Sequence, residues 1–194
     1  MTFRLTKCSM PSAGGWLRMA DTGGRIRRSL AQKRVPLGFV AAIVTLILAR
    51  PTWVTWIAGL VVASIGECLR IWAAGHLEKG REVTRSGPYR FTGHPLYVGS
   101  TVIAGGVAMA ARSPAAAVVI AFYMAATISA AIRTEEEDLR RTFGSTYDDY
   151  QASRAAPMVR RFSLSRARRN REHRAVAGLL GGFALLALRM LALP

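Results

Sequence analysis

Residues 36–76 read PLGFVAAIVTLILARPTWVTWIAGLVVASIGECLRIWAAGH, two apolar runs on either side of Arg50-Pro51. Proline cannot continue a helix without losing a backbone hydrogen bond, and it drives the preceding residue out of helical geometry. The pattern therefore predicts a tight hairpin of two apolar helices. Trp53 and Trp56 follow the turn and suit the far membrane interface, where amphipathic rings are favoured.

Three further segments are nearly free of charge, at residues 95–111, 115–132 and 175–194. A membrane-spanning helix needs about 20 apolar residues, with about 17 as the lower range. The run at 36–49 is shorter, so we expect it to thin the bilayer locally. The run at 52–76 reaches the length by continuing through Glu67 and Arg70. We therefore predict an all-α fold, an integral-membrane helical bundle of about five transmembrane helices. Arg189 leaves open whether the last helix spans the bilayer or lies in the interface.

The composition favours a membrane protein over a soluble one. The 194 residues are 51% hydrophobic, yet 27 Lys plus Arg stand against 11 Asp plus Glu, a net charge of +16. A soluble nucleic-acid binder this basic would rarely be this apolar, and a disordered basic tail is excluded for the same reason. Cys8 and Cys68 cannot form a disulfide scaffold, and no metal cluster is expected.

The basic residues are sorted along the chain. Segments 1–35, 77–94 and 133–174 carry eight, four and eleven of the 27 basic residues, and they fall on one side if each apolar segment crosses once. The opposite side has only Arg50 and Arg112. This positive-inside pattern places the N-terminus and both long segments in the cytoplasm. We predict a basic cytoplasmic leader at 1–35, a membrane core at 36–174 and a C-terminal membrane helix at 175–194. The Ala- and Arg-rich composition suggests a bacterial cytoplasmic membrane.

The first cytoplasmic segment ends in a pattern that favours anion binding. Ser86-Gly87-Pro88 indicates a turn, and His94-Pro95 marks the start of the third apolar helix, where proline is well tolerated. The N–H groups of Leu96, Tyr97 and Val98 would then point toward the cytoplasmic end of the bundle, where they could bind a carboxylate or phosphate. Arg90 and His94 lie beside this helix N-terminus. Alternatively, His94 only caps the helix and Arg90 reaches lipid phosphate.

The second cytoplasmic segment continues the fourth apolar helix as RTEEEDLRRTFGSTYDDY, residues 133–150. Helical periodicity turns Glu135 and Glu136 toward the bundle, and it turns Glu137 and Asp138 outward, where Arg140 and Arg141 can pair with them. Gly144 is expected to end the helix. Tyr147 and Tyr150 would face together, either at a site or as interfacial anchors.

Glu67 and Arg70 lie within the second apolar run. Ionisable groups at such depth are expensive and often functional. A self-satisfied ion pair that fixes helix packing remains the alternative.

These residues resemble a known family. Gly87-Pro88-Tyr89-Arg90 followed by His94-Pro95-Leu96-Tyr97-Val98-Gly99 is similar to the GPYR…RHPLYxG signature of the isoprenylcysteine carboxyl methyltransferase and phospholipid methyltransferase superfamily. The later Glu135-Glu136, Leu139, Phe143-Gly144, Tyr147 and Tyr150 resemble its EExxLxxxFGxxYxxY segment. The resemblance covers roughly residues 60–160 and departs at Gly93, where the family usually has Arg.

The resemblance implies an enzyme with a cytoplasmic pocket for S-adenosylmethionine that methylates a lipophilic, membrane-embedded acceptor. The acceptor would be an isoprenylcysteine-type carboxylate or a lipid head group; an amine would have to lose a proton, whereas a carboxylate needs no general base. The implied catalytic residues are Arg90 and Glu136. The implied cofactor-binding residues are His94, Leu96, Tyr97, Gly99, Glu135, Glu136, Tyr147 and Tyr150.

Two other functions stay open at this point. One is an NADPH-dependent membrane reductase of the sterol-reductase-like relatives, and the other is a non-enzymatic membrane partner subunit. The expected partners are membrane lipids and the methyl acceptor, without nucleic acid, and the oligomeric state is not predicted.

Overall fold

The computed structural model describes residues 36–156 and 158–192. The leader predicted at 1–35 therefore lies outside the described residues. The described part is helical and forms no strand. Its elements are a first helix Pro36–Leu48, α2 Trp53–His76, the 3-10 turn η1 Gly87–Arg90, α3 Pro95–Ala111, α4 Pro114–Phe143, α5 Ser145–Gln151, α6 Leu164–Arg169 and α7 Glu172–Ala192.

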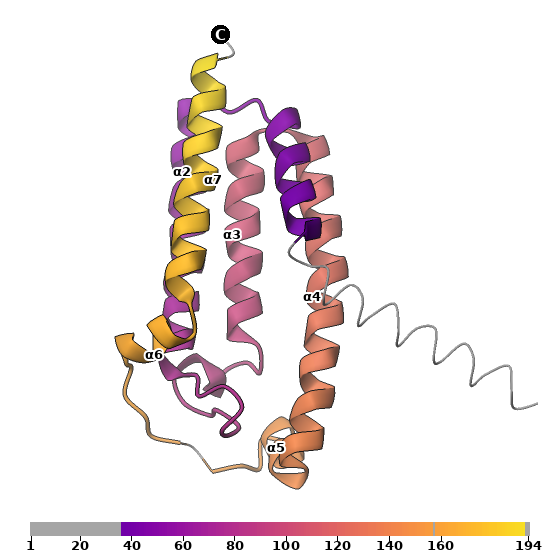
Figure 1. Ribbon diagram of the computed structural model, residues 1–194, viewed down its shortest axis with the longest axis vertical. Helices are drawn as coiled ribbons and strands as arrows, with labels where there is room; N and C mark the ends of the chain where they lie inside the picture. The colour runs from indigo at the N-terminus through magenta and orange to yellow at the C-terminus, as the bar shows by residue number, and fades with distance from the viewer. Residues whose placement is uncertain (1–35, 157, 193–194) are drawn as a thin grey trace, which may run out of the picture.

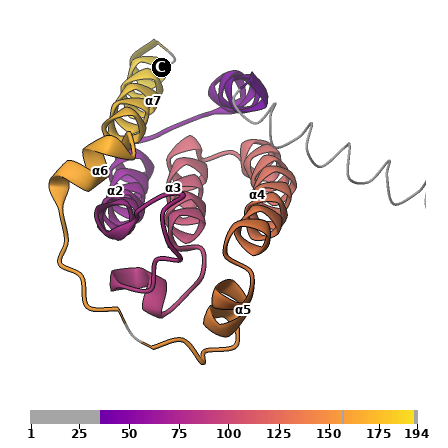
Figure 2. The ribbon, with the colours of Figure 1, turned by 60° about the horizontal axis from the view of Figure 1, so that its bottom comes forward.

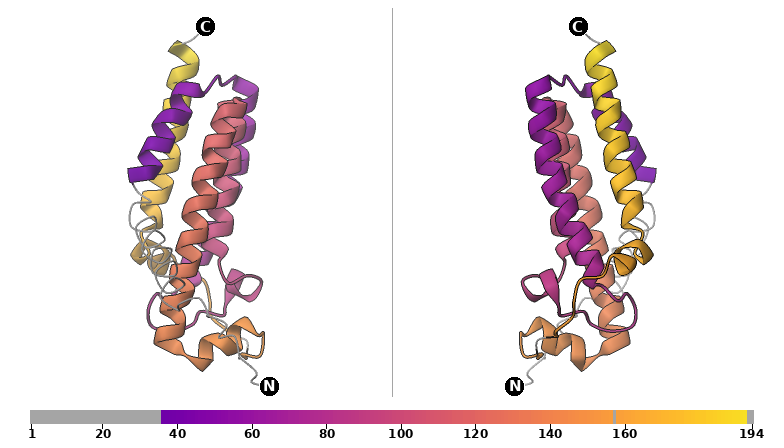
Figure 3. Two further views of the ribbon diagram at one scale, coloured as in Figure 1. Left: turned by 90° about the vertical axis from the view of Figure 1, so that its right-hand side faces the viewer. Right: turned by 90° about the vertical axis from the view of Figure 1, so that its left-hand side faces the viewer.

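Five of these helices are apolar, and they run along the long axis of the molecule (Figures 1 and 3). By length and composition α2, α4 and α7 can each cross a membrane, and the first helix and α3 are shorter apolar helices. The predicted all-α membrane bundle is thereby confirmed. Helix α4 continues through residues 133–143 and ends before Gly144, as expected. One boundary differs from the prediction, because α7 begins at Glu172 and not at residue 175.

The turn at Arg50-Pro51 forms as predicted. Thr52 caps α2, since its hydroxyl accepts a hydrogen bond from the Thr55 N–H. The Arg50 N–H donates to the Ala111 carbonyl at 2.8 Å, which ties the turn to the end of α3. Arg189 of α7 donates to the Ala49 carbonyl at 3.0 Å and so satisfies a free acceptor at the end of the first helix. α7 therefore runs the length of the bundle, alongside α2 (Figure 1).

The helices α2 and α3 pack through glycines. A Cβ atom at Gly59 would lie 2.4 Å from the Gly106 carbonyl oxygen, and one at Gly66 would lie 2.7 Å from the Gly99 carbonyl oxygen. Such small residues let two helix backbones approach closely, which is the usual device of membrane helix pairs. This pair forms the fixed centre of the bundle.

Charged segments gather at one end of the bundle. The segment that follows α2, the end of α4, and α5 and α6 lie together there (Figures 1 and 2). Arg50 and Arg112 lie at the other end, beside the end of α3. The structure thus reproduces, for the described residues, the sorting of basic residues that the sequence predicts.

Candidate functional site

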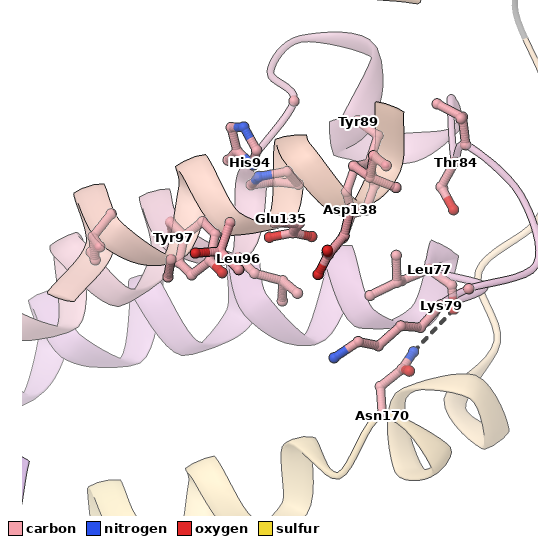
Figure 4. Close-up of a pocket in the computed structure, with 18 of the residues that line it drawn as sticks. Leu77, Lys79, Thr84, Tyr89, His94, Leu96, Tyr97, Glu135, Asp138 and Asn170 are labelled. Carbon is pink, nitrogen blue, oxygen red and sulfur yellow. Dashed lines mark hydrogen bonds between the residues drawn. The ribbon is translucent and has the colours of Figure 1, made fainter. Parts of the chain in front are cut away.

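A cavity of about 670 Å³ lies at the charged end of the bundle. Its walls come from the end of α2, the segment 77–94, the start of α3, the second half of α4, and α5 (Figure 4). Cavities of roughly 300–1,000 Å³ are the usual size for a small-molecule or cofactor site. This cavity is our candidate active site.

Most of the predicted site residues line this cavity, namely His94, Leu96, Tyr97, Glu135, Tyr147 and Tyr150. Segments that are far apart in the sequence therefore meet here as expected. Three predicted residues do not line it: Arg90, Gly99 and Glu136.

Gly99 and Arg90 lie elsewhere for different reasons. Gly99 is buried against α2, where a Cβ would lie 2.6 Å from the Arg70 Cγ, so it serves helix packing and not the cavity. Arg90 is exposed at the end of η1. The catalytic role predicted for Arg90 has no support from this position.

His94 is the N-cap residue of α3, and its carbonyl accepts hydrogen bonds from Tyr97 N–H at 3.0 Å and Val98 N–H at 3.2 Å. The expectation of three free N–H groups at this helix start is therefore wrong. Two of them bind the His94 carbonyl, as in any first helical turn, and Leu96 N–H is the one that remains. No side chain of the described residues caps this helix.

Glu136 acts on the site through His94. Its Oε1 lies 3.1 Å from His94 Nε2, and both side chains are partly buried. The imidazole ring also packs against Tyr97, with ring centroids 5.8 Å apart. Glu136 therefore orients His94 from outside the cavity lining.

Tyr150 joins α5 to the segment before α3, whereas Tyr147 forms a hydrogen bond within α5. The Tyr150 hydroxyl donates to the Tyr89 carbonyl at 2.7 Å, and the Tyr147 hydroxyl accepts from Gln151 Nε2 at 2.9 Å. Burial raises the pKa of Tyr89, Tyr147 and Tyr150 above the ordinary value. These phenols therefore stay protonated at neutral pH and hold the cavity wall together.

Two carboxylates point into the cavity from α4, those of Glu135 and Asp138 (Figure 4). Neither forms a hydrogen bond or ion pair with another described residue. The prediction that Asp138 points outward is wrong, because a residue three positions after Glu135 shares its helix face. Arg140 instead binds Asp148 of α5 at 3.2 Å.

Lys79 extends into the same cavity from the segment that follows α2 (Figure 4). Sequence reasoning missed it, because a single lysine in a basic loop has no distinguishing neighbour. The cavity therefore combines carboxylates on α4 with an ammonium group on the facing segment.

An ion pair between α2 and α7 also lines the cavity. Arg70 donates to both carboxylate oxygens of Glu172 on α7, with distances of 3.0–3.2 Å, and also to the Ser100 hydroxyl on α3. Arg70 Nε is 3.8 Å from Glu67, too far for a hydrogen bond. The Glu67–Arg70 ion pair that the sequence suggested is present at this longer distance. Glu172 adds a second carboxylate, which is hydrogen-bonded to the same guanidinium.

Gly93 lines the cavity without being needed for packing. The nearest atoms to a Cβ placed there belong to Tyr150, at 4.0 Å. A larger side chain would fit at this position, where the related signature has Arg.

The chain is similar in sequence to known proteins. A family model described as phospholipid methyltransferase matches residues 46–146. The chain is also 32% identical over 137 residues to the nickel-cobalt-cadmium resistance protein NccN of Alcaligenes xylosoxydans xylosoxydans, a match that covers 64% of this chain and 62% of that protein. The chain thus spans about three fifths of the length of this curated relative. No solved structure matches.

Proposed function

This chain belongs to the phospholipid methyltransferase family. We propose that it transfers a methyl group from S-adenosylmethionine to a lipophilic acceptor in the membrane. The observation that carries the proposal is the pair of carboxylates, Glu135 and Asp138, that enter the cavity without a partner among the described residues. Both side chains are exposed to solvent, so they are available to pair with a cationic ligand.

The residues present fit the chemical groups of this cofactor. It carries a carboxylate, an amino group, a sulfonium cation and an adenine. Glu135 and Asp138 suit the amino group and the sulfonium. Leu96 N–H and Lys79 suit the carboxylate. The rings of Tyr97 and Tyr147, which line the cavity, suit a cation or an adenine.

The cofactor, when bound, supplies a methyl carbon that is open to in-line displacement by the acceptor. The chain's own contribution is to position the reactants and to exclude water. His94, oriented by Glu136, and the buried tyrosines give the cavity a fixed wall for that purpose. No side chain needs to form a covalent bond with the substrate.

We also infer that this end of the bundle faces the cytoplasm, where the cofactor is made available. The support is the gathering of basic residues in segments 77–94 and 133–174, which the positive-inside rule assigns to the cytoplasmic side. Attachment of a membrane-impermeant reagent to a cysteine placed at Ser153, compared with one placed at Arg112, tests this orientation.

Calorimetry on the purified protein tests the cofactor. We expect binding of S-adenosylmethionine and S-adenosylhomocysteine, and no binding of NADPH, because the extra phosphate would face Glu135 and Asp138. Incubating membranes that contain the protein with methyl-labelled S-adenosylmethionine should then label a lipid-soluble product. A folded protein that binds NADPH and neither methyl-donor compound would support the reductase alternative, and one that binds none of the three would support a partner subunit.

A further inference from the structure

A second cavity, of about 700 Å³, lies between the first helix, α3, α4 and α7. Its walls are mostly apolar, with side chains such as Phe39, Ile43, Ile103 and Leu179. Arg70, Ser100, Tyr123 and Met124 line this cavity and also the candidate active site. The two cavities therefore meet at the Arg70–Ser100 contact.

Among the described residues, the charged ones that line the apolar cavity are Glu67 and Arg70. The Glu67 side chain is 6% exposed, and neither of its oxygens accepts a hydrogen bond from a described residue. Burying a carboxylate without donors is costly, and a buried charge is normally paired or hydrogen-bonded. Glu67 is thus a buried carboxylate with an ion-pair contact to Arg70 Nε at 3.8 Å but no hydrogen-bond donor among the described residues.

Arg70 is not free to donate a hydrogen bond to Glu67 or to bind an anion. Its guanidinium donates to both oxygens of Glu172 and to the Ser100 hydroxyl. With Glu67 and Glu172 ionised, two carboxylates share one guanidinium, and the cluster carries a net negative charge. A positively charged group or a hydrogen-bond donor would complete it.

We propose that the apolar cavity binds a lipophilic amine with a single hydrocarbon chain, whose nitrogen lies at Glu67. An acceptor carboxylate would meet Glu67 and Glu172 at close range and be repelled. A phosphate group would find no uncommitted cation in the described lining. The volume suits one drug-sized apolar molecule. The role of this amine as methyl acceptor rests on the proposed function, whereas its binding in the apolar cavity does not.

Photo-crosslinking tests the proposal without any methyl donor. The full chain in nanodiscs of uncharged lipid is irradiated with a diazirine-bearing dodecylamine, and the labelled peptides are identified by mass spectrometry. We expect labelling of α3 and α7, competed by dodecylamine at least tenfold better than by dodecanoic acid. Glu67→Gln should lower labelling at least tenfold, whereas Glu137→Gln, which lines neither cavity, should not.

A second variant keeps the test decisive if Glu67→Gln fails to fold. Gly178 lines the cavity, and a Cβ there meets nothing within 4 Å, so Gly178→Leu fills the space without a backbone clash. It should abolish labelling while leaving S-adenosylhomocysteine binding unchanged. Equal competition by dodecanoic acid or by a diacyl phospholipid, or unchanged labelling of Glu67→Gln or Gly178→Leu, would overturn the proposal. Loss of S-adenosylmethionine binding alone would overturn only the proposed function.

Discussion

The α2–α3 pair and the flank of the bundle formed by α4 differ in how closely they pack. α2 and α3 touch backbone to backbone, with Gly59 against Gly106 and Gly66 against Gly99. α4 instead borders both cavities and presents Glu135 and Asp138 to one of them. Close packing of small residues supplies stability, whereas the flank that borders the cavities holds exposed carboxylates that are available to a ligand. The glycine contacts and the exposed carboxylates thus lie on different parts of the bundle, although the start of α3 also lines the candidate site.

The largest effect is expected from breaking the α2–α3 contact. In Gly106→Leu the new Cβ would lie 2.5 Å from the Gly59 carbonyl oxygen, and backbone cannot move aside as a side chain can. Overpacking costs roughly 1–3 kcal/mol or more, and we expect the upper end or complete loss of folded protein. Thermal unfolding in detergent, followed by circular dichroism, measures it.

The matched control is Gly105→Leu, one residue earlier in α3. A Cβ at Gly105 meets nothing within 4 Å, so the melting temperature should stay the same or rise, since leucine favours helix. Equal destabilisation by both variants would show that the glycine contact does not hold the pair together.

The next largest effect is expected from substitution of the two carboxylates of α4 that line the cavity. Glu135→Gln and Asp138→Asn should each weaken S-adenosylhomocysteine binding, because each removes a charged acceptor. The loss should be roughly tenfold to a hundredfold, as for hydrogen bonds to charged groups. The melting temperature of the apo protein should not fall, because these side chains form no hydrogen bond or ion pair with other described residues.

Calorimetry on the two variants and on Glu137→Gln measures this effect. Glu137 is a neighbouring carboxylate of the same helix that lies outside the cavity lining. If Glu137→Gln weakened binding as much as the other two, a general charge effect would replace the assignment to the cavity.

A smaller effect is expected from the contact between Glu136 of α4 and His94 at the start of α3. His94→Ala and Glu136→Gln should each weaken cofactor binding by roughly tenfold, the size of one charged hydrogen bond. Because Glu136 acts through His94, the double variant should bind no worse than His94→Ala alone. A double-mutant cycle measures this coupling, and additive losses would contradict the positioning role.

The smallest effect concerns Gly93. Gly93→Arg should fold normally, since the nearest atoms to its Cβ are 4.0 Å away. The added cation should strengthen S-adenosylhomocysteine binding by roughly twofold to fivefold, the range of an exposed charge contact. The uncharged Gly93→Met serves as control, and weaker binding by the Arg variant would show that the carboxylates of α4 attract the new side chain away from the ligand.

Local rules in the sequence determined most of the architecture. The turn at Arg50-Pro51, the start of α3 at His94-Pro95 and the end of α4 at Gly144 all depend on residues within one helical turn, and the structure has each of them. The sorting of basic residues could be counted directly. The family signature, together with helical periodicity, brought His94, Glu135 and Tyr147 to the same site, and the structure places them around one cavity.

Only the tertiary structure decided which partners the charged groups take. Arg70 donates hydrogen bonds to Glu172, 102 positions away, whereas it reaches Glu67, three positions away, only as an ion pair at 3.8 Å. Arg189 caps the first helix from α7, and Gly99 serves a helix contact although it lies inside the signature motif. Spacing rules describe neighbours on one helix, and they are silent on which faces of separate helices meet. Packing in three dimensions makes that choice, and it is the same choice that leaves Glu67, Glu135 and Asp138 facing two cavities.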